Sequence, residues 1–139
     1  MRFHASKILR GHCLCGAVQF TLEGPPNWVG HCHCDSCRRA SSSPMTTWIG
    51  QPNGRWTLTG RRPTVFESSP GQERGFCPCC GSQIYYRSTR YPGELHFYAA
   101  LLEDPSEVTP TAQFHLDEKI DWLDDALGLP AEQLEENDR

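Results

Sequence analysis

The amino-acid sequence predicts an all-β fold with a short helical tail at its C-terminus. Short segments of β-favouring residues follow one another along the chain, and turn residues separate them. The 12 glycines and 11 prolines among 139 residues fit many turns and short elements better than long helices. We find no internal repeat and no low-complexity linker, so we expect residues 1–139 to form a single domain.

The clearest strand signal is at residues 16–23, where apolar and polar side chains alternate before a Gly-Pro-Pro turn. Five more short strands are expected from their β-rich composition: residues 28–32, 45–49, 55–59, 63–67 and 83–87. Residues 38–44 are polar and are expected to form a loop, whose first residues are able to form a helical turn. Residues 68–72 are expected to form a turn.

The longest apolar run, residues 94–102, is expected to be a central strand, because Leu95, Phe97, Ala99 and Leu101 share one face when extended. A helix is the alternative there. Residues 113–116 are expected to form a last strand. Residues 121–128 suggest one or two helical turns that end at Gly128, and Pro130 is placed to start a final turn.

Charge divides the chain unevenly, within a net charge of -4. Residues 117–139 carry nine acidic and two basic residues, which predicts an acidic tail from about residue 117. Residues 1–116 carry eight acidic and 11 basic residues, ten of them arginine. Arginine binds carboxylates through a planar fork, so this part suits a small anionic substrate, or it is a solvated mixed surface. Nucleic-acid-binding domains are usually more basic, and we expect no nucleic-acid partner.

Nothing in the sequence predicts export or membrane insertion. The first seven residues lack the apolar stretch of a signal peptide. No segment approaches the roughly 18 uninterrupted apolar residues of a membrane span. We therefore expect a cytoplasmic protein with no membrane partner.

Eight cysteines fall into three tight clusters, which are Cys13 and Cys15; Cys32, Cys34 and Cys37; and Cys77, Cys79 and Cys80. A reducing cytoplasm disfavours disulfides, and cysteines one or two residues apart are poor disulfide partners. Such spacing is typical of zinc ligands, which number four in a closed structural site and three in a catalytic site with one open position. The clusters therefore predict two zinc ions, one of each kind.

Two pairs of cysteines are expected to form the closed site: Cys13 and Cys15 with Cys77 and Cys80. In an extended segment, residues 13 and 15 point to the same side while Leu14 points into the core. Gly81 permits the backbone bend that a ligating turn needs. Zinc held in this way contributes on the order of 10 kcal/mol that is coupled to folding.

The remaining cluster, Cys32, Cys34 and Cys37, places three thiolates within a six-residue segment. With no fourth protein ligand, zinc there acts as a Lewis acid or activates a thiol. A fourth ligand would close the site, and the candidates are Cys79, His31, His33 and His12. Cys79 is also interpreted as an idle free thiol, and His33 points away from the metal if its segment is extended.

The chain resembles the glutathione-dependent formaldehyde-activating enzyme family, also called the centromere protein V/GFA family. The matching segments are residues 11–18, 32–39 and 74–82, with weaker likeness at residues 115–123 and 129–130. The resemblance implies a zinc-bound fold of the β-tent type. It also implies a structural zinc on Cys13, Cys15, Cys77 and Cys80 and a second zinc on the other three cysteines. Cys79 stands where the family varies, which leaves the closure of the second site open.

The resemblance further implies a carbon–sulfur lyase that joins glutathione and formaldehyde into S-(hydroxymethyl)glutathione. We expect the second zinc to bind a small thiol substrate such as glutathione, and Arg38 and Arg39 to bind its carboxylates; a solvated arginine pair is the alternative. A non-catalytic zinc-stabilised binding module is the competing hypothesis. A redox or metal-storage protein is a third.

Overall fold

The computed structural model describes residues 7–132, which form a mostly β structure with two sheets. A three-stranded sheet has the order β1-β2-β5, with strands Ile8–His12, Val18–Glu23 and Trp56–Gly60. A seven-stranded sheet has the order β10-β3-β4-β9-β8-β7-β6. Its strands are, in chain order, β3 (Trp28–Cys32), β4 (Thr46–Pro52), β6 (Thr64–Ser69), β7 (Gln72–Phe76), β8 (Gln83–Ser88), β9 (Glu94–Tyr98) and β10 (Ala112–Phe114).

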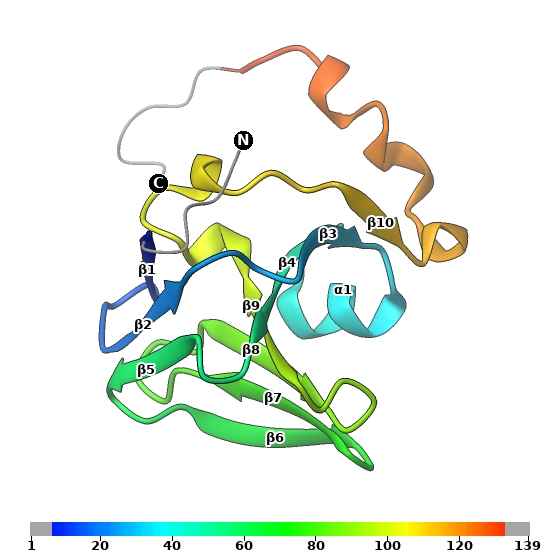
Figure 1. Cartoon of the computed structure of the whole chain (residues 1–139). Helices are drawn as coiled ribbons and strands as arrows, with labels where there is room; N and C mark the ends of the chain where they lie inside the picture. The colour runs from blue at the N-terminus through cyan, green and yellow to red at the C-terminus, as the bar shows by residue number, and fades with distance from the viewer. Residues whose placement is uncertain (1–6, 133–139) are drawn as a thin grey trace.

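Helical structure within these residues is short. One α-helix, α1 (Asp35–Ser41), follows β3. The 3-10 helices are η1 (Ala99–Leu101), η2 (Pro105–Glu107), η3 (Leu116–Glu118), η4 (Asp121–Leu123) and η5 (Ala126–Gly128). The helix α1 lies beside β3 at the end of the large sheet, and the C-terminal segment extends away from both sheets (Figure 1). None of the helices in residues 7–132 is both long and apolar enough to cross a membrane.

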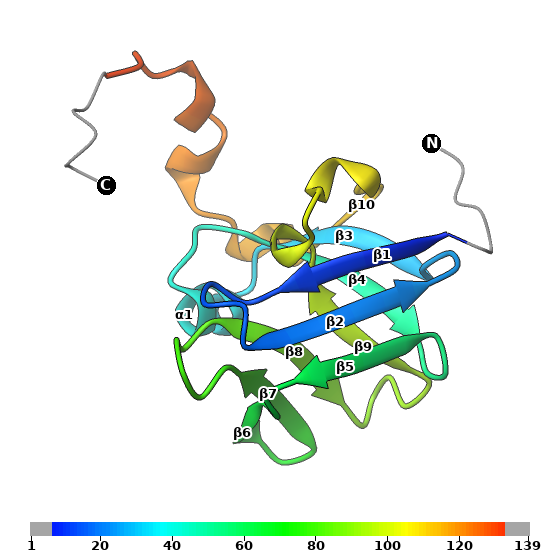
Figure 2. The same ribbon diagram turned by 90° about the vertical axis from the view of Figure 1, so that its left-hand side faces the viewer.

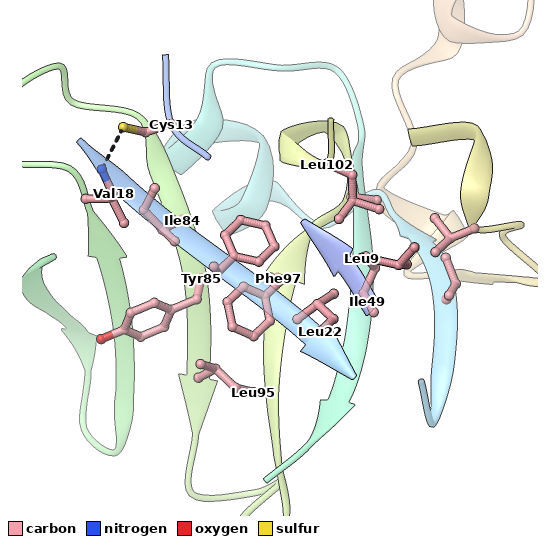
Figure 3. Packing of buried hydrophobic residues seen from close by; sticks show 14 of the residues in the cluster. Leu9, Cys13, Val18, Leu22, Ile49, Ile84, Tyr85, Leu95, Phe97 and Leu102 are labelled. Atoms are coloured by element: carbon pink, nitrogen blue, oxygen red, sulfur yellow. Dashed lines mark hydrogen bonds between the residues drawn. The ribbon is translucent and has the colours of Figure 1, made fainter. Parts of the chain in front are cut away.

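The small sheet covers one face of the large sheet, and the core lies between them (Figure 2). Val18, Phe20 and Leu22 alternate along β2 and are all buried. They belong to one core cluster with Phe97 of β9 (Figure 3). The Phe97 ring stacks on that of Phe20, with centroids 4.7 Å apart. The period of two that predicted this strand therefore also identifies its core face.

The opposite face of the large sheet is also buried, near the end of β3. Trp48 and Tyr98 pack there around Cys32 and Cys37 in a second, smaller cluster. Because successive side chains of a strand point to opposite faces, β9 contributes Phe97 to the first cluster and Tyr98 to the second. The large sheet thus has one face for the core and one face for the site.

The predicted all-β fold with a short helical tail is confirmed. Each expected strand corresponds to an observed one, and residues 94–98 form a central strand between β4 and β8. The strand ends at Tyr98, however, so the prediction for residues 99–102 was wrong, and η1 follows instead. The strands β1 and β7 were not predicted, and β7 begins at Gln72, within the turn expected at residues 68–72. The tail contains η4 and η5, while no helix follows Pro130 up to residue 132, and residues 133–139 lie outside the described part.

The loop expected at residues 38–44 was also partly wrong. The helix α1 begins three residues earlier, at Asp35, and continues to Ser41. The Cys34 side chain accepts a hydrogen bond from the Cys37 N–H and so satisfies one of the free donors at the helix start. A cysteine is not among the residues that usually cap a helix, and the sequence pattern therefore hid this start.

Candidate metal centres

Cys13, Cys15, Cys77 and Cys80 form a four-thiol group, with all four sulfurs within 4.8 Å of one another. The first pair lies in the turn after β1 and the second in the turn after β7. The Sγ atoms of Cys13 and Cys15 are 3.7 Å apart, and those of Cys15 and Cys77 are 3.9 Å apart. A tetrahedral ion with metal–sulfur bonds of about 2.3 Å places its sulfurs about 3.8 Å apart. The four-thiol group therefore fits zinc.

Backbone hydrogen bonds shape the two turns of the four-thiol group. Gly16 and Gly81 have φ angles of 81° and 79°, a conformation that favours glycine. The Val18 N–H donates to the Cys13 sulfur at 3.3 Å, and the Cys79 N–H donates to the Cys77 sulfur at 3.3 Å. Such bonds favour the thiolate form that a metal requires.

Ser82 links the two turns and was not singled out from the sequence. Its hydroxyl accepts the Leu14 N–H at 3.0 Å and lies 3.2 Å from the Cys80 sulfur. The hydrogen bond from Ser82 lowers the pKa of the Cys80 thiol to about 5. The expectation for Leu14 was wrong: residues 14–15 form a turn rather than a strand, and the Leu14 side chain is 84% exposed.

Cys32, Cys34 and Cys37 form a three-thiol group, again with sulfurs within 4.8 Å of one another. Cys32 is the last residue of β3, Cys34 caps α1 and Cys37 lies in the first turn of α1. The Cys32 thiol donates to the Cys37 sulfur across 3.8 Å, and the Cys37 N–H donates to the Cys34 sulfur at 3.3 Å. The spacing fits three corners of a zinc tetrahedron.

Within residues 7–132, no fourth Cys, His, Asp or Glu joins the three-thiol group. His33 is buried and points its Nε2 at Gln113 Oε1, 2.9 Å away. His31 Nδ1 lies 2.8 Å from Thr47 Oγ1. His12 Nδ1 lies 2.8 Å from the Cys13 carbonyl oxygen, and Cys79 is exposed next to the four-thiol group. The alternatives for a fourth ligand are therefore placed elsewhere.

A buried arginine accompanies the three-thiol group and was not assigned a role from the sequence. Arg74 of β7 is 6% exposed, its Nη2 lies 3.9 Å from the Cys37 sulfur, and its guanidinium lies 4.9 Å from the Tyr86 ring centroid. A hydrogen bond from the Cys32 thiol, together with the Arg74 cation, lowers the pKa of the Cys37 thiol to about 5. Three thiolates and a divalent ion carry one net negative charge, which the arginine offsets. Burial raises the pKa of the neighbouring Tyr98 to about 12.

Arg38 and Arg39 share one carboxylate partner on α1. Arg38 Nη2 donates to Asp35 at 3.3 Å, and Arg39 Nε donates to the same carboxylate at 3.0 Å. The Arg39 side chain is 79% exposed, whereas that of Arg38 is 25% exposed. Both arginines thus lie directly after the three-thiol group, but a ligand carboxylate would compete with Asp35 for them.

Comparison with known proteins identifies the family. The family of glutathione-dependent formaldehyde-activating enzymes (GFA) matches residues 8–118, which include all eight cysteines. The chain belongs to the GFA family. The resemblance of its cysteine motifs is thereby confirmed.

Two curated relatives agree with this GFA membership. One, from Schizosaccharomyces pombe, is named an uncharacterized lyase and is 30% identical, over 82% of this chain and 82% of that protein. Another, from Halomonas elongata, bears the name glutathione-dependent formaldehyde-activating enzyme, marked as provisional. It is 27% identical over 84% of this chain and 80% of its own.

A solved structure supports the fold of this GFA member. The crystal structure of a Rhodobacter sphaeroides protein superimposes with a TM-score of 0.60 and 20% identity. The match covers 75% of this chain and 98% of that one. At this identity the likeness shows the fold alone.

Proposed function

We propose that this GFA family member is a zinc-dependent carbon–sulfur lyase-type enzyme that combines a small thiol with formaldehyde. Glutathione is the proposed thiol and S-(hydroxymethyl)glutathione the proposed product, in line with the names of the family and of the Halomonas relative. The observation that carries the proposal is the three-thiol group: three buried or half-buried sulfurs in zinc geometry with no fourth ligand among residues 7–132. Three protein ligands are typical of catalytic zinc.

The two cysteine groups have different roles in this proposal. The four-thiol group is complete and joins two turns that are 62 residues apart along the chain, so its role is structural. The three-thiol group lies within one six-residue segment at the edge of α1. A metal there cross-links only this short segment, so we assign it a chemical role.

Zinc on Cys32, Cys34 and Cys37 would supply Lewis acidity and would favour the thiolate form of a bound thiol. The reaction forms one bond between the thiol sulfur and the formaldehyde carbon. The carbonyl π electrons move to oxygen, which takes up the proton that the thiol has lost. Arg74 offsets the negative charge of the thiolates, and Trp48 and Tyr98 pack against them and exclude water. Arg38 and Arg39 remain proposed partners for substrate carboxylates.

Native mass spectrometry of the purified protein, with and without glutathione, tests the proposal first. We expect two zinc ions and a glutathione adduct in the wild type, and one zinc and no adduct in Cys37→Ser. The matched control is Cys79→Ser, since Cys79 is exposed and lies outside both groups; it should keep both ions and the adduct. NMR exchange spectroscopy of glutathione with formaldehyde should show acceleration above the spontaneous rate only with the wild type and the control. A Cys37→Ser protein that retains two ions, or that accelerates the exchange equally, contradicts the proposal.

A non-catalytic binding module is the second candidate, and the C-terminal segment is the observation that favours it. Trp122, Leu127 and Leu129 are 61%, 101% and 70% exposed, which is unusual for large apolar side chains. In that case both zinc ions are structural. A wild-type protein with two ions, no glutathione adduct and no acceleration of the exchange would favour this function.

A further inference from the structure

A cavity lies between α1 and the strands β6, β7 and β8, on the site face of the large sheet (Figure 1 shows these elements). Its volume is ≈ 490 Å³, within the range of pockets for small molecules. Its lining residues are Asp35, Ser36, Arg39, Ala40, Phe66, Ser68, Arg74, Phe76 and Gln83. The cavity is thus adjacent to the three-thiol group, because α1 carries Cys37 as well as four of the lining residues.

Arg74 is shared between the cavity and the three-thiol group. Its Nη2 lies 3.9 Å from the Cys37 sulfur, while its Nη1 is buried and has no hydrogen-bond partner. It forms no ion pair with a carboxylate of residues 7–132. A buried donor without a partner is costly, and a charged one more so. The free half of this guanidinium fork is suited to an oxygen of a ligand carboxylate.

The other cavity residues specify the rest of the ligand. Gln83 Oε1 is also buried without a partner, so it is free to accept an N–H. Phe66, Phe76 and Ala40 offer apolar surface between the polar groups. The lining therefore fits a small molecule with a carboxylate, an amide or ammonium N–H and a short apolar chain, which is the chemistry of a small peptide.

We propose that this cavity binds the carboxylate-bearing part of the thiol substrate and that Arg74 anchors that carboxylate. The proposal deepens the proposed function and rests on it, because it assumes that the substrate sulfur lies at the three-thiol group. Arg74 then contacts the Cys37 sulfur of the three-thiol group and, in the cavity, the carboxylate of the substrate. It selects thiols with a carboxylate at a fixed distance from the sulfur over simple alkyl thiols. Arg39, at the same cavity but paired with Asp35, has a secondary part.

The competing account is that Arg74 serves only to offset the thiolate charge. The two accounts differ in what a ligand carboxylate contributes, and a ligand without a free thiol separates them. S-methylglutathione is such a probe, because its sulfur is a thioether and cannot bind as a thiolate. Its dimethyl ester has the same shape without the carboxylate charges.

Isothermal titration calorimetry of the zinc-loaded protein compares the two probes. We expect S-methylglutathione to bind at least about 10-fold more tightly than its dimethyl ester, since a charge-assisted hydrogen bond is worth about that factor. Arg74→Met should lose the same factor for the acid and none for the ester. Arg87→Met is the matched control, because Arg87 is exposed on β8 and lines a different cavity; it should bind as the wild type does.

Equal binding of acid and ester, or no measurable binding of the acid to the wild type, overturns the proposal. Should Arg74→Met fail to fold, the comparison of the two probes on the wild type decides alone. The proposed function fails separately: carboxylate-dependent binding of S-methylglutathione without acceleration of the formaldehyde exchange keeps the cavity assignment and removes the reaction. Acceleration with equal binding of acid and ester keeps the reaction and removes the assignment.

Discussion

Loss of one thiolate from the four-thiol group should destabilise the zinc-loaded protein more than loss of one from the three-thiol group. The pair Cys77→Ser and Cys37→Ser tests this, because both side chains are buried, at 0% and 7% exposure. The two variants should differ in stability because the two metals close loops of different length. The four-thiol group connects Cys15 with Cys77, 62 residues later, whereas Cys32 and Cys37 are 5 residues apart.

The loop lengths set the expected magnitudes. By the entropy of loop closure, a cross-link over roughly 60 residues stabilises the fold by about 4 kcal/mol, and one over roughly 5 residues by about 2 kcal/mol. For a chain of this size, 1 kcal/mol shifts the melting temperature by about 4 °C. Cys77→Ser should therefore melt at least about 16 °C below the wild type, since zinc binding coupled to folding contributes more than the cross-link alone, and Cys37→Ser about 8 °C below it.

Differential scanning calorimetry of the zinc-loaded variants measures the shift, and native mass spectrometry of the same samples counts the ions. Cys79→Ser serves as the control and should melt as the wild type does. The reasoning is refuted if Cys37→Ser melts as low as Cys77→Ser, or unfolds altogether, while each has lost one ion. It is equally refuted if Cys77→Ser loses its ion and keeps the wild-type melting temperature.

Two further predictions concern the core and the dependence on pH. Phe97→Ala should lower the free energy of unfolding by about 3–5 kcal/mol in chemical denaturation, because the ring is fully buried against Phe20, whereas Phe66→Ala, at 61% exposure, should change it by less than about 0.5 kcal/mol. Folding lowers the pKa of the Cys37 and Cys80 thiols to about 5. The stability that these two thiolates give the folded state is therefore complete above the ordinary thiol pKa of about 8.5, and it is lost as the pH falls through 5. Zinc retention measured against pH should accordingly fall near or below pH 5, since protons compete with the metal; retention of both ions at pH 3 would contradict this.

Local patterns in the sequence predicted most of the strands. Alternation in residues 16–23 predicted both the strand β2 and its buried face, because a half-buried strand must alternate. The tight cysteine spacings likewise predicted that neighbouring thiols converge, because ligands one to three residues apart need no knowledge of the wider fold. The meeting of Cys13 and Cys15 with Cys77 and Cys80 is not a property of a short segment, because these pairs lie about 62 residues apart along the chain.

Where the sequence was misleading, distant parts of the chain decided the outcome. Residues 8–12 carry no clear strand signal, yet they form β1 because they pair with β2, and Gly11 leaves room for the Phe20 ring. A side chain at Gly11 would place its Cβ 2.3 Å from that ring. The apolar run of residues 94–102 is compatible with a longer strand, and its periodicity does not reveal the turn into η1 after Tyr98. Long-range packing therefore fixed what local pattern left open.

Within the three-thiol site, local sequence pattern predicts the metal ligands, whereas long-range packing brings in the other side chains. The ligands of the three-thiol group come from one short segment, but Arg74 reaches Cys37 from β7, and Gln113 holds His33 from β10. Tertiary structure makes these contacts, since β10 pairs with β3, and α1 and β7 line the same cavity. No spacing in the sequence marks a buried arginine three residues before Cys77 as a partner of Cys37.

The side chains of β9 alternate between the two faces of the large sheet. Leu95 and Phe97 point into the core between the sheets, while His96 and Tyr98 point to the face that carries the three-thiol group. Glu94 accepts a hydrogen bond from Trp28 Nε1 at 2.7 Å and lies 2.7 Å from His96 Nε2, so it fixes both rings on that face. Substitutions along one strand should thus alternate in effect: those in the core lower stability, and those on the site face alter the surroundings of the metal. The sequence alone shows a mainly apolar run that begins with Glu94 and contains His96, and the second face explains why these two polar residues stand in it.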